Sequence, residues 1–225
     1  MNDYTKMIIK SPLFRGISKK ETDFILFYLK PQIKKYKKGV YITLDGEPVR
    51  ELMLLLEGSV RIVKDDISGA RSFMAQYRPG DYFLEAFACI DAKSPVSSQT
   101  AADSLVMAIP YKNIIDMPPS VIETQCKILK NLLVVVGNKA LAAHRQIEHV
   151  SKPGIRKKIM SYLSAQKSRA GKKEFIIPLS KTDLADFLFI NRSAMTRELA
   201  AMRKEKLLNF KGRKFTLPPD IKYNR

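Results

Sequence analysis

The longest hydrophobic pattern in the chain lies in its middle, where nine apolar residues recur at alternating spacings of four and three. A 3.5-residue repeat places a narrow apolar seam on a helix that winds around a partner helix. The pattern predicts a helix over residues 122–150 and a homodimer formed along it. An ordinary core helix is the alternative, because Leu132, Val134 and Val135 widen the apolar face. The predicted seam consists of Ile122, Cys126, Leu129, Leu133, Val136, Ala140, Ala143, Ile147 and Val150.

Before this helix, short β-prone runs alternate with glycines. The runs cover residues 40–44, 52–56, 60–63, 72–77, 82–83 and 105–109. They predict an antiparallel β domain over about residues 36–111, layered as a sandwich or a roll. A small helical cap is expected within residues 12–29, and Pro118, Pro119 and Pro153 bound the long helix. We therefore expect a β domain with its cap in residues 1–117, the long helix in 118–151 and a further domain in 152–225.

The C-terminal domain begins with an amphipathic stretch over residues 155–163 and a predicted strand over 174–179. Ser180 and Asp183 form a Ser-x-x-Asp capping pattern, which predicts a helix over 181–188. After a break at 189–190, Asn191 caps a second helix, and the pair makes a helix-turn-helix. Runs at 207–210 and 215–217 flank a basic turn and predict a β-hairpin. The domain is therefore expected to be a winged helix-turn-helix.

The second helix of this pair has two distinct faces. Met195, Leu199 and Met202 share one face, and an arc of about 140° opposite them is polar or small. A helix fits the DNA major groove, where arginine makes bidentate contacts to guanine. A solvated helix face is the alternative. The candidate DNA contacts are Asn191, Arg192, Ser193, Thr196 and Arg197, with Lys211, Arg213 and Lys214 on the hairpin.

The charge of the chain is concentrated in the same region. Residues 151–225 hold 12 lysines and 7 arginines against 6 acidic residues, whereas residues 1–150 hold 21 basic and 16 acidic residues. Such a field attracts nucleic acid or an anionic membrane surface. No apolar run approaches the roughly 20 residues of a spanning helix, and residues 1–10 are too poor in apolar residues for a secretory signal. We expect a cytoplasmic protein that binds double-stranded DNA and no membrane.

Motifs in two parts of the chain, residues 182–199 (TDLADFLFINRSAMTREL) and residues 38–85, together resemble the bacterial Crp/Fnr family of transcription regulators. Residues 182–199 are similar to the family's helix-turn-helix, and Arg192-Ser193-Ala194 resembles one branch of it. The motifs Lys38-Gly39, Asp45-Gly46, 57–60 (EGSV) and 79–85 (PGDYFLE) are similar to its cyclic-nucleotide-binding β-roll. The resemblance implies an α+β fold with a sensing β-roll, a dimerisation helix and a winged helix-turn-helix. It also implies a homodimer that binds an inverted-repeat operator and works with RNA polymerase.

Three positions depart from the family pattern. Ser193 stands where members that read a guanine-containing half-site commonly carry glutamate, so the operator sequence cannot be carried over. Phe189 occupies a turn position where the family usually has glycine, and positive φ there would cost a bulky residue about 1 kcal/mol or more. Glu85 matches the glutamate that binds the ribose of cyclic AMP, but the expected arginine-serine site reads Pro95-Val96-Ser97-Ser98.

The missing arginine argues against cyclic AMP, because a buried phosphodiester needs a cationic partner. We expect another small-molecule effector or none, and no cofactor. Two cysteines cannot hold an iron–sulfur cluster. His144 and His149 are expected to be partly exposed rather than haem ligands, and Cys89 to pack rather than sense redox state. Glu85 is read either as an effector contact or as a structural carboxylate satisfied by backbone N–H groups. The candidate effector pocket comprises Tyr77, Phe83, Glu85, Ser97, Ser98, Leu132 and Val135.

The sequence argues against two other function classes. A cupin-like metal enzyme needs two or three histidines and a carboxylate inside its β domain, and no histidine lies between residues 1 and 143. The chain is therefore not expected to be an enzyme or to bind a metal. A cyclic-nucleotide-binding regulatory subunit without a DNA role leaves the basic C-terminal domain unexplained.

Overall fold

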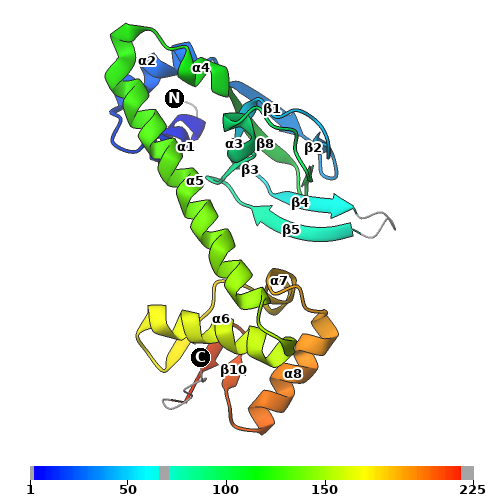
Figure 1. The fold of residues 1–225 in the computed structure, drawn as a ribbon. Coiled ribbons are helices and arrows are strands. Elements are labelled where there is room, and N and C mark those ends of the chain that lie inside the picture. The colour runs from blue at the N-terminus through cyan, green and yellow to red at the C-terminus, as the bar shows by residue number, and fades with distance from the viewer. Residues whose placement is uncertain (1–2, 66–70, 219–225) are drawn as a thin grey trace. The chain divides into compact units, whose positions relative to one another are not determined.

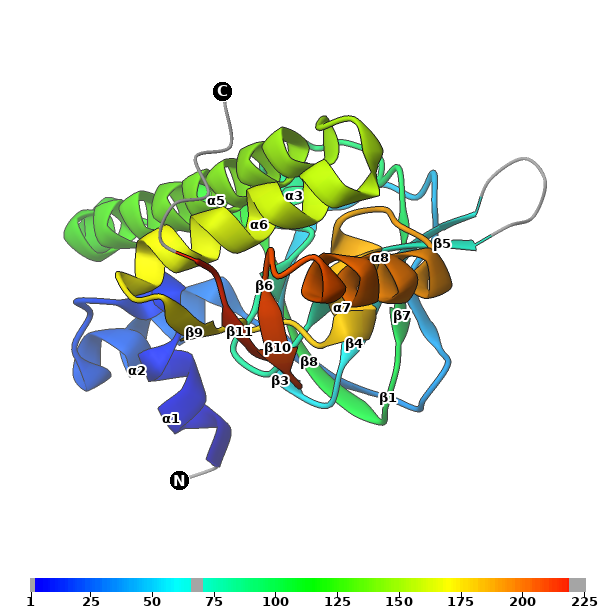
Figure 2. The same cartoon turned by 90° about the horizontal axis from the view of Figure 1, so that it is seen from below.

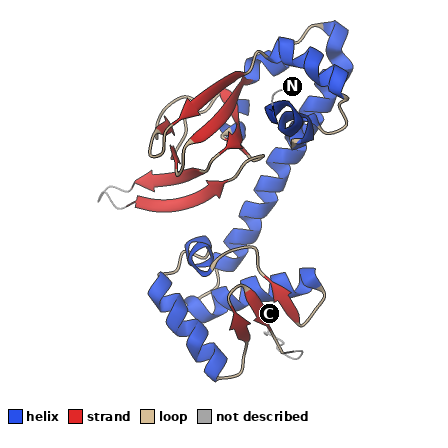
Figure 3. Cartoon of the chain, turned by 180° about the vertical axis from the view of Figure 1, so that it is seen from behind, coloured by secondary structure: helices blue, strands red, loops and turns tan. Residues whose placement is uncertain are grey.

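The computed structural model describes residues 3–65 and 71–218, and the chain divides into two compact units, Met1–Ala140 and Leu141–Arg225. The boundary lies inside the long helix α5 (Ile122–Val150), which begins and ends where the sequence predicts. Figure 1 shows the order of the elements along the chain, and Figure 3 shows that strands occur in both units. The two units are described separately below.

The first unit is a β-roll of two antiparallel four-stranded sheets. One sheet has the order β1-β8-β3-β6 and contains β1 (Gln32–Tyr36), β8 (Ser104–Pro110), β3 (Glu51–Glu57) and β6 (Tyr82–Phe83). The other has the order β2-β7-β4-β5 and contains β2 (Tyr41–Thr43), β7 (Ser97–Thr100), β4 (Val60–Asp65) and β5 (Arg71–Tyr77). The predicted roll is confirmed. Strands β1 and β7 were not expected, because their charged or hydroxyl-rich sequences lack the apolar run of a buried strand.

Short helices cover the ends of the roll. The N-terminal cap contains α1 (Asp3–Lys10), the 3₁₀ turn η1 (Pro12–Phe14) and α2 (Lys19–Leu29). Three more elements follow the strands: α3 (Glu85–Cys89), α4 (Tyr111–Ile115) and the 3₁₀ turn η2 (Pro119–Val121). Helix α2 starts with a capping box in which the Glu21 carboxylate accepts from the Ser18 N–H at 2.7 Å. The hydrogen bonds from Ser18 and from the Lys127 ammonium lower the pKa of Glu21 to about 2.

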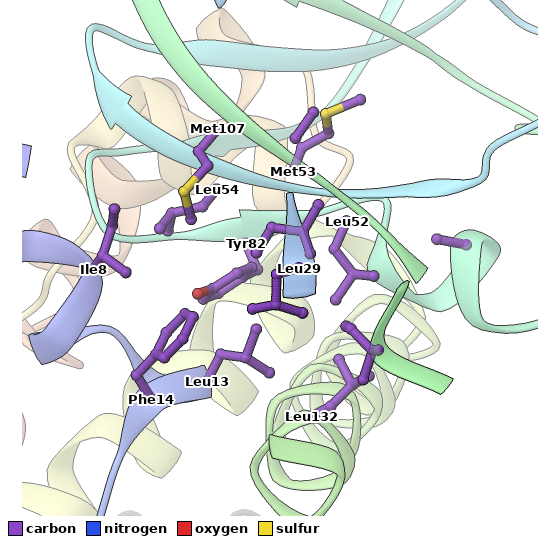
Figure 4. Packing of buried hydrophobic residues seen from close by; sticks show 14 of the residues in the cluster. Ile8, Leu13, Phe14, Leu29, Leu52, Met53, Leu54, Tyr82, Met107 and Leu132 are labelled. Carbon is purple, nitrogen blue, oxygen red and sulfur yellow. The ribbon is translucent and has the colours of Figure 1, made fainter. Parts of the chain in front are cut away.

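The core of this unit joins the cap, the roll and one face of α5. Figure 4 shows Leu13 and Phe14 of the cap beside Leu29, Tyr82 and Leu132. Each of these five side chains is buried. The burial of such side chains stabilises the unit by about 1.5–3 kcal/mol for each one. Helix α5 is therefore part of the first unit as far as Ala140.

The other face of α5 is uncovered in the single chain. Leu133 is 72% exposed, Ile147 is 59% exposed and Ile122 is 53% exposed. Ile128, Leu132 and Val135 are instead buried against the roll. The exposed residues of the predicted seam thus lie on a different face from the core-facing stripe, whereas Leu129 and Val136 pack against the core. Of the nine predicted seam residues, Leu129, Val136 and Val150 are half-buried, and the exposed ones are Ile122, Cys126, Leu133, Ala140, Ala143 and Ile147.

The second unit is a winged helix-turn-helix (Figure 2). Its helices are α6 (Gly154–Ala170), α7 (Lys181–Phe187) and α8 (Arg192–Lys204). Its sheet has the order β10-β11-β9, with β9 (Glu174–Ile176), β10 (Asn209–Lys211) and β11 (Lys214–Thr216). The predicted strand 174–179 ends three residues early, before Pro178. The hairpin is tighter than predicted, because Gly212 adopts φ +62° and lets Lys211 and Lys214 pair.

One expectation about the end of α5 was wrong. His149 is 6% exposed rather than partly exposed. Its Nδ1 lies 2.8 Å from Ser161 Oγ, and its ring meets the Tyr162 ring edge-on at 5.8 Å. Packing against α6 therefore overrides the polar character of the residue. His144 is exposed, as expected.

Candidate nucleic-acid interface and effector site

The turn between α7 and α8 has a defined geometry. Ser180 Oγ accepts from the Asp183 N–H at 3.1 Å, so α7 begins with the predicted capping box. The helix ends in a Schellman arrangement, in which the N–H of Ile190 donates to Ala185 O at 2.9 Å and that of Phe189 to Asp186 O at 3.1 Å. Phe189 adopts φ +50°. The turn therefore keeps the left-handed conformation that glycine would favour, rather than changing shape, and Phe189 carries the strain.

The faces of α8 separate as the sequence predicts. Met195, Leu199 and Met202 are buried in the core of the second unit. The opposite side of the helix is open to solvent. Its exposed residues are Arg192, Ser193, Thr196, Arg197 and Ala200.

The side chains on the exposed face differ in what they already contact. The Arg192 guanidinium lies 3.0 Å from an Asp186 oxygen of α7. Thr196 Oγ1 donates to Arg192 O at 2.9 Å. Arg197 is exposed and has no ion pair among the residues that the structure describes. Arg197 can thus bind a ligand without breaking an ion pair. Arg192 would first have to break its ion pair with Asp186.

The first turn of α8 is capped by its own chain. Asn191 Oδ1 accepts from the N–H groups of Ser193 and Ala194 at 3.0 and 3.3 Å, and from Ser193 Oγ at 2.6 Å. A phosphate bound at these N–H groups would have to displace the Asn191 side chain. These two N–H groups are therefore already satisfied within the chain.

Two cations that sequence reasoning missed flank the hairpin. The Lys181 ammonium lies 4.2 Å from the centre of the Phe210 ring, and the Arg203 guanidinium lies 5.7 Å from it. Phe210 in turn stacks on Phe215 at 5.5 Å. The Phe210 ring thus contacts Lys181 at the start of α7 and Arg203 near the end of α8. The signal in the sequence was the aromatic residue beside the basic turn.

The basic residues predicted on the hairpin are exposed, but two of them have partners. Lys214 Nζ lies 2.5 Å from Glu174 of β9, and an Arg213 N–H donates to Pro178 O at 3.4 Å. Lys211 is exposed without an ion pair in the described part of the chain. On the hairpin, Lys211 is therefore open to a ligand, whereas Arg213 and Lys214 also make contacts within the second unit.

Arg156 of α6 fixes the position of α8. Its guanidinium lies 2.5 Å from Glu198 in the middle of α8 and 2.7 Å from Glu205, the residue that caps the end of that helix. The hydrogen bonds from Arg156 lower the pKa of Glu205. The bidentate geometry sets the direction of α8 as well as holding it. Sequence reasoning did not single out Arg156, because an arginine on an amphipathic helix looks like an ordinary surface residue.

In the first unit, the carboxylate of Glu85 meets an ammonium group instead of backbone N–H groups. Its side chain is 3% exposed, and its two oxygens lie 2.8 and 2.9 Å from Lys139 Nζ of α5. The expectation of a carboxylate satisfied by the roll's N–H groups is thus wrong about the partner. Lys139 follows Ile128, Leu132 and Val135 at spacings of four, three and four, so it lies on the core-facing stripe of the helix. That spacing could have revealed it.

Part of the predicted effector pocket comes together around this pair. Tyr77 stacks on Phe83 with 5.5 Å between ring centres, and Lys139 Nζ lies 4.7 Å from the centre of the Tyr77 ring. Burial, with the negative charge of Glu85 adding to it, raises the pKa of Tyr77 to about 12. The phenol is therefore neutral at ordinary pH.

The other predicted pocket residues have different surroundings. Ser98 Oγ is buried without a hydrogen-bond partner among the described residues. Ser97 Oγ accepts from the Asp45 N–H at 3.0 Å. Leu132 and Val135 belong to the hydrophobic core. The structure thus gives the serines no arginine neighbour on their strand, β7.

A groove beside α5 was not predicted. It has a volume of about 570 Å³ and lies between the cap, the β5–β6 turn and the helix. Val135 and Lys139 line it, as do Tyr82 and Asp81. Of the predicted effector residues, only Val135 is among those that line this groove. The groove gives solvent a route to the Lys139 side chain, which is 37% exposed.

Two further properties of the described residues bear on function. Within residues 3–65 and 71–218, no group of three or more His, Cys, Asp and Glu side chains is placed to hold a metal ion. None of the helices in those ranges is long and apolar enough to cross a membrane.

Comparison with known proteins agrees with this architecture. Residues 33–118 match the cyclic nucleotide-binding domain, and residues 157–219 match the Crp-like helix-turn-helix domain. The electron transport regulator A of Shewanella oneidensis is 24% identical over 186 residues, which is 80% of this chain and 72% of that protein. The fumarate and nitrate reduction regulatory protein of Vibrio cholerae is 22% identical over 190 residues, 82% of this chain and 74% of that protein.

A solved structure shows the same fold. The c-di-GMP responsive global regulator CLP of Xanthomonas campestris aligns with a TM-score of 0.62 and 17% identity, over 87% of this chain and 98% of that one. The β-roll and the helix-turn-helix of this chain thus lie where the two domain matches fall, and the long helix α5 lies between them. With these two domains in this order, the protein belongs to the Crp/Fnr family of transcription regulators.

Proposed function

We propose that this transcription regulator acts as a homodimer that binds an inverted-repeat operator and responds to an effector other than cyclic AMP. In this proposal residues 1–117 sense the effector, 118–151 dimerise and 152–225 bind DNA, and the recognition helix belongs to the Arg-Ser-Ala branch. RNA polymerase is a further partner. The observation that carries the proposal is the exposed, arginine-bearing face of α8 on a helix that is capped at one end and braced by Arg156 at the other.

The proposed dimer rests on the uncovered stripe of α5, which consists of the exposed seam residues Ile122, Cys126, Leu133, Ala140, Ala143 and Ile147. Leu133 and Ile147 are large apolar side chains that are more than half exposed. They recur at the 3.5-residue spacing of helices that pair. Two copies related by a two-fold axis would cover this stripe and present two recognition helices. Their half-sites would then lie about one turn of DNA, roughly 34 Å, apart.

The proposed exclusion of cyclic AMP rests on charge. The only cation that contacts Glu85 in the described residues is Lys139, and the pair is neutral as a whole. No arginine stands on β7, where the phosphate of a cyclic nucleotide would need one. The site therefore offers a cyclic phosphate no uncompensated positive charge.

DNA binding is tested by selecting bound duplexes from a random pool and comparing the enriched operator with a scrambled duplex. We expect the enriched operator to be an inverted repeat. In the Arg192→Ala/Arg197→Ala variant, the ratio of the affinity for the operator to that for the scrambled duplex should fall at least tenfold, since each bidentate contact contributes about 1–3 kcal/mol. The matched control Arg61→Ala/Arg78→Ala removes two exposed arginines from the first unit and should discriminate like the parent. Unchanged discrimination in the α8 variant would refute the assignment of the recognition helix.

A further inference from the structure

The environment of Glu85 has the chemistry of an ammonium site. The carboxylate is almost completely buried, and both oxygens lie within 2.9 Å of a single nitrogen, Lys139 Nζ. Glu85 is the first residue of α3, directly after Leu84, which adopts φ +62°. After this turn of the chain, the carboxylate lies beside Lys139 of α5. A buried carboxylate of this kind needs a cation, because an unpaired charge in a poorly solvated position is costly.

Two more groups complete the site. The carbonyl oxygen of Tyr82 accepts a hydrogen bond from the same ammonium. The Tyr77 ring presents its face 4.7 Å away, and its stacking on Phe83 fixes that orientation. A carboxylate, a carbonyl oxygen and an aromatic face are three ways in which proteins bind an alkylammonium, and a phosphate would be repelled by each of them. These three groups thus favour a positively charged ligand over an anionic one.

The ligand of this site is supplied by the chain itself. Lys139 lies on the core-facing stripe of α5, one residue before the end of the first unit at Ala140. Its side chain is 37% exposed and lines the groove beside α5, so a small molecule can reach the position from solvent when the side chain is absent.

We propose that Glu85, Tyr82 O and Tyr77 form an alkylammonium-binding site whose resident ligand is Lys139, and that this contact fastens the Lys139 turn of α5 to the β-roll. Any external ligand that takes this place is a primary amine in its charged form, not an anionic nucleotide. The inference deepens the effector part of the proposed function, but the site itself is independent of DNA binding and can be tested without it.

The test is chemical rescue of the full-length Lys139→Ala variant. We expect the variant to unfold about 5 °C below the parent and to exchange amide hydrogens faster over residues 132–140. Propylammonium chloride at tens of millimolar should restore most of both losses. Sodium propionate, 1-propanol and potassium chloride at matched concentration should restore neither. Parent-like melting and exchange in Lys139→Ala, or equal rescue by propionate, would overturn the proposal.

Two control variants make the rescue specific. Lys139→Met keeps the bulk of the side chain and fills the space, so propylammonium should not rescue it. Glu85→Gln/Lys139→Met removes both charges without leaving one unpaired, which keeps the fold testable if Lys139→Ala does not fold. We expect no response of this variant to the amine. A rescue of either control as large as that of Lys139→Ala would show that the amine acts elsewhere.

Discussion

The guanidinium of Arg192, at the start of α8, lies 3.0 Å from the carboxylate of Asp186 on α7. The pair joins the two helices of the helix-turn-helix on their solvent side, with the Arg192 side chain 63% exposed. If Arg192 reads a base, this contact must be exchanged for one to DNA. In the free protein this candidate base-contacting arginine is therefore paired with a carboxylate, a group of the same sign of charge as a phosphate.

Removal of the competing carboxylate should strengthen DNA binding. Exposed ion pairs contribute about 0.2–1 kcal/mol, so we expect Asp186→Asn to raise operator affinity by about two- to fivefold in a fluorescence anisotropy titration. In the Arg192→Ala background the same substitution should have no effect. Weaker binding by Asp186→Asn would instead mean that Asp186 positions Arg192 for its contact.

The left-handed conformation of Phe189 predicts a stabilising substitution. Phe189 adopts φ +50° and is 53% exposed, so glycine relieves backbone strain and little packing is lost. We expect Phe189→Gly to raise the free energy of unfolding by about 1 kcal/mol in urea titrations. Phe189→Ala retains a Cβ atom and should not reproduce this gain. A destabilised glycine variant would show that the ring contributes more than the strain costs.

His149 should make the stability of the protein depend on pH. Burial lowers the pKa of His149, while its neighbours act in opposite directions: Glu148 raises it, and Arg169 and Lys152 lower it. The unfolded chain binds the proton first as the pH falls below about 6.5, so the free energy of unfolding should decrease from pH 7 toward the lower folded pKa and then level off.

This dependence can be assigned by substitution. Urea titrations at pH 7.5, 6.5, 5.5 and 5.0 should show a smaller slope for His149→Gln than for the parent. His144→Gln replaces an exposed histidine on the same helix and should retain the parental slope. Equal slopes for the parent and both variants would contradict the role assigned to His149.

The proposed dimer predicts the effect of a charge on the uncovered stripe. Burial of one leucine contributes about 1.5–3 kcal/mol, and a dimer buries two copies of Leu133. Leu133→Glu should therefore raise the dimer dissociation constant by about 100-fold or more in sedimentation equilibrium, and the fold of each chain should persist because the side chain is 72% exposed. Lys130→Glu places the same charge on an exposed position off the seam and should leave the dimer intact. A parent that sediments as a monomer would refute the dimer itself.

Local patterns in the sequence predicted the fold closely. Helix α5 begins and ends where its prolines and its apolar repeat indicate, and the capping signals at Ser180 and Asn191 start α7 and α8. Strand β1 escaped prediction because its sequence, QIKKY, is almost entirely exposed and owes its conformation to pairing with β8. Propensity could not reveal a strand that tertiary pairing imposes.

The sites were harder to predict than the fold, because they depend on contacts between distant positions. Glu85 was identified from its motif, but its partner Lys139 is 54 residues away and was not singled out from the sequence. Similarly, nothing near Arg156 in the sequence shows that Glu198 and Glu205 will meet it. Periodicity assigns a side chain to a face, and only the packed structure shows what that face meets.

The exposure of Cys126 on the uncovered stripe has a practical consequence. In a parallel two-fold pairing along that stripe, the two copies of this thiol would approach one another across the axis. Mild oxidation would then join the two chains through a disulfide between the two copies of Cys126. A gel run without reductant would show the joined chains as a dimer band. Preparations kept without a thiol reagent would accumulate the joined chains during storage.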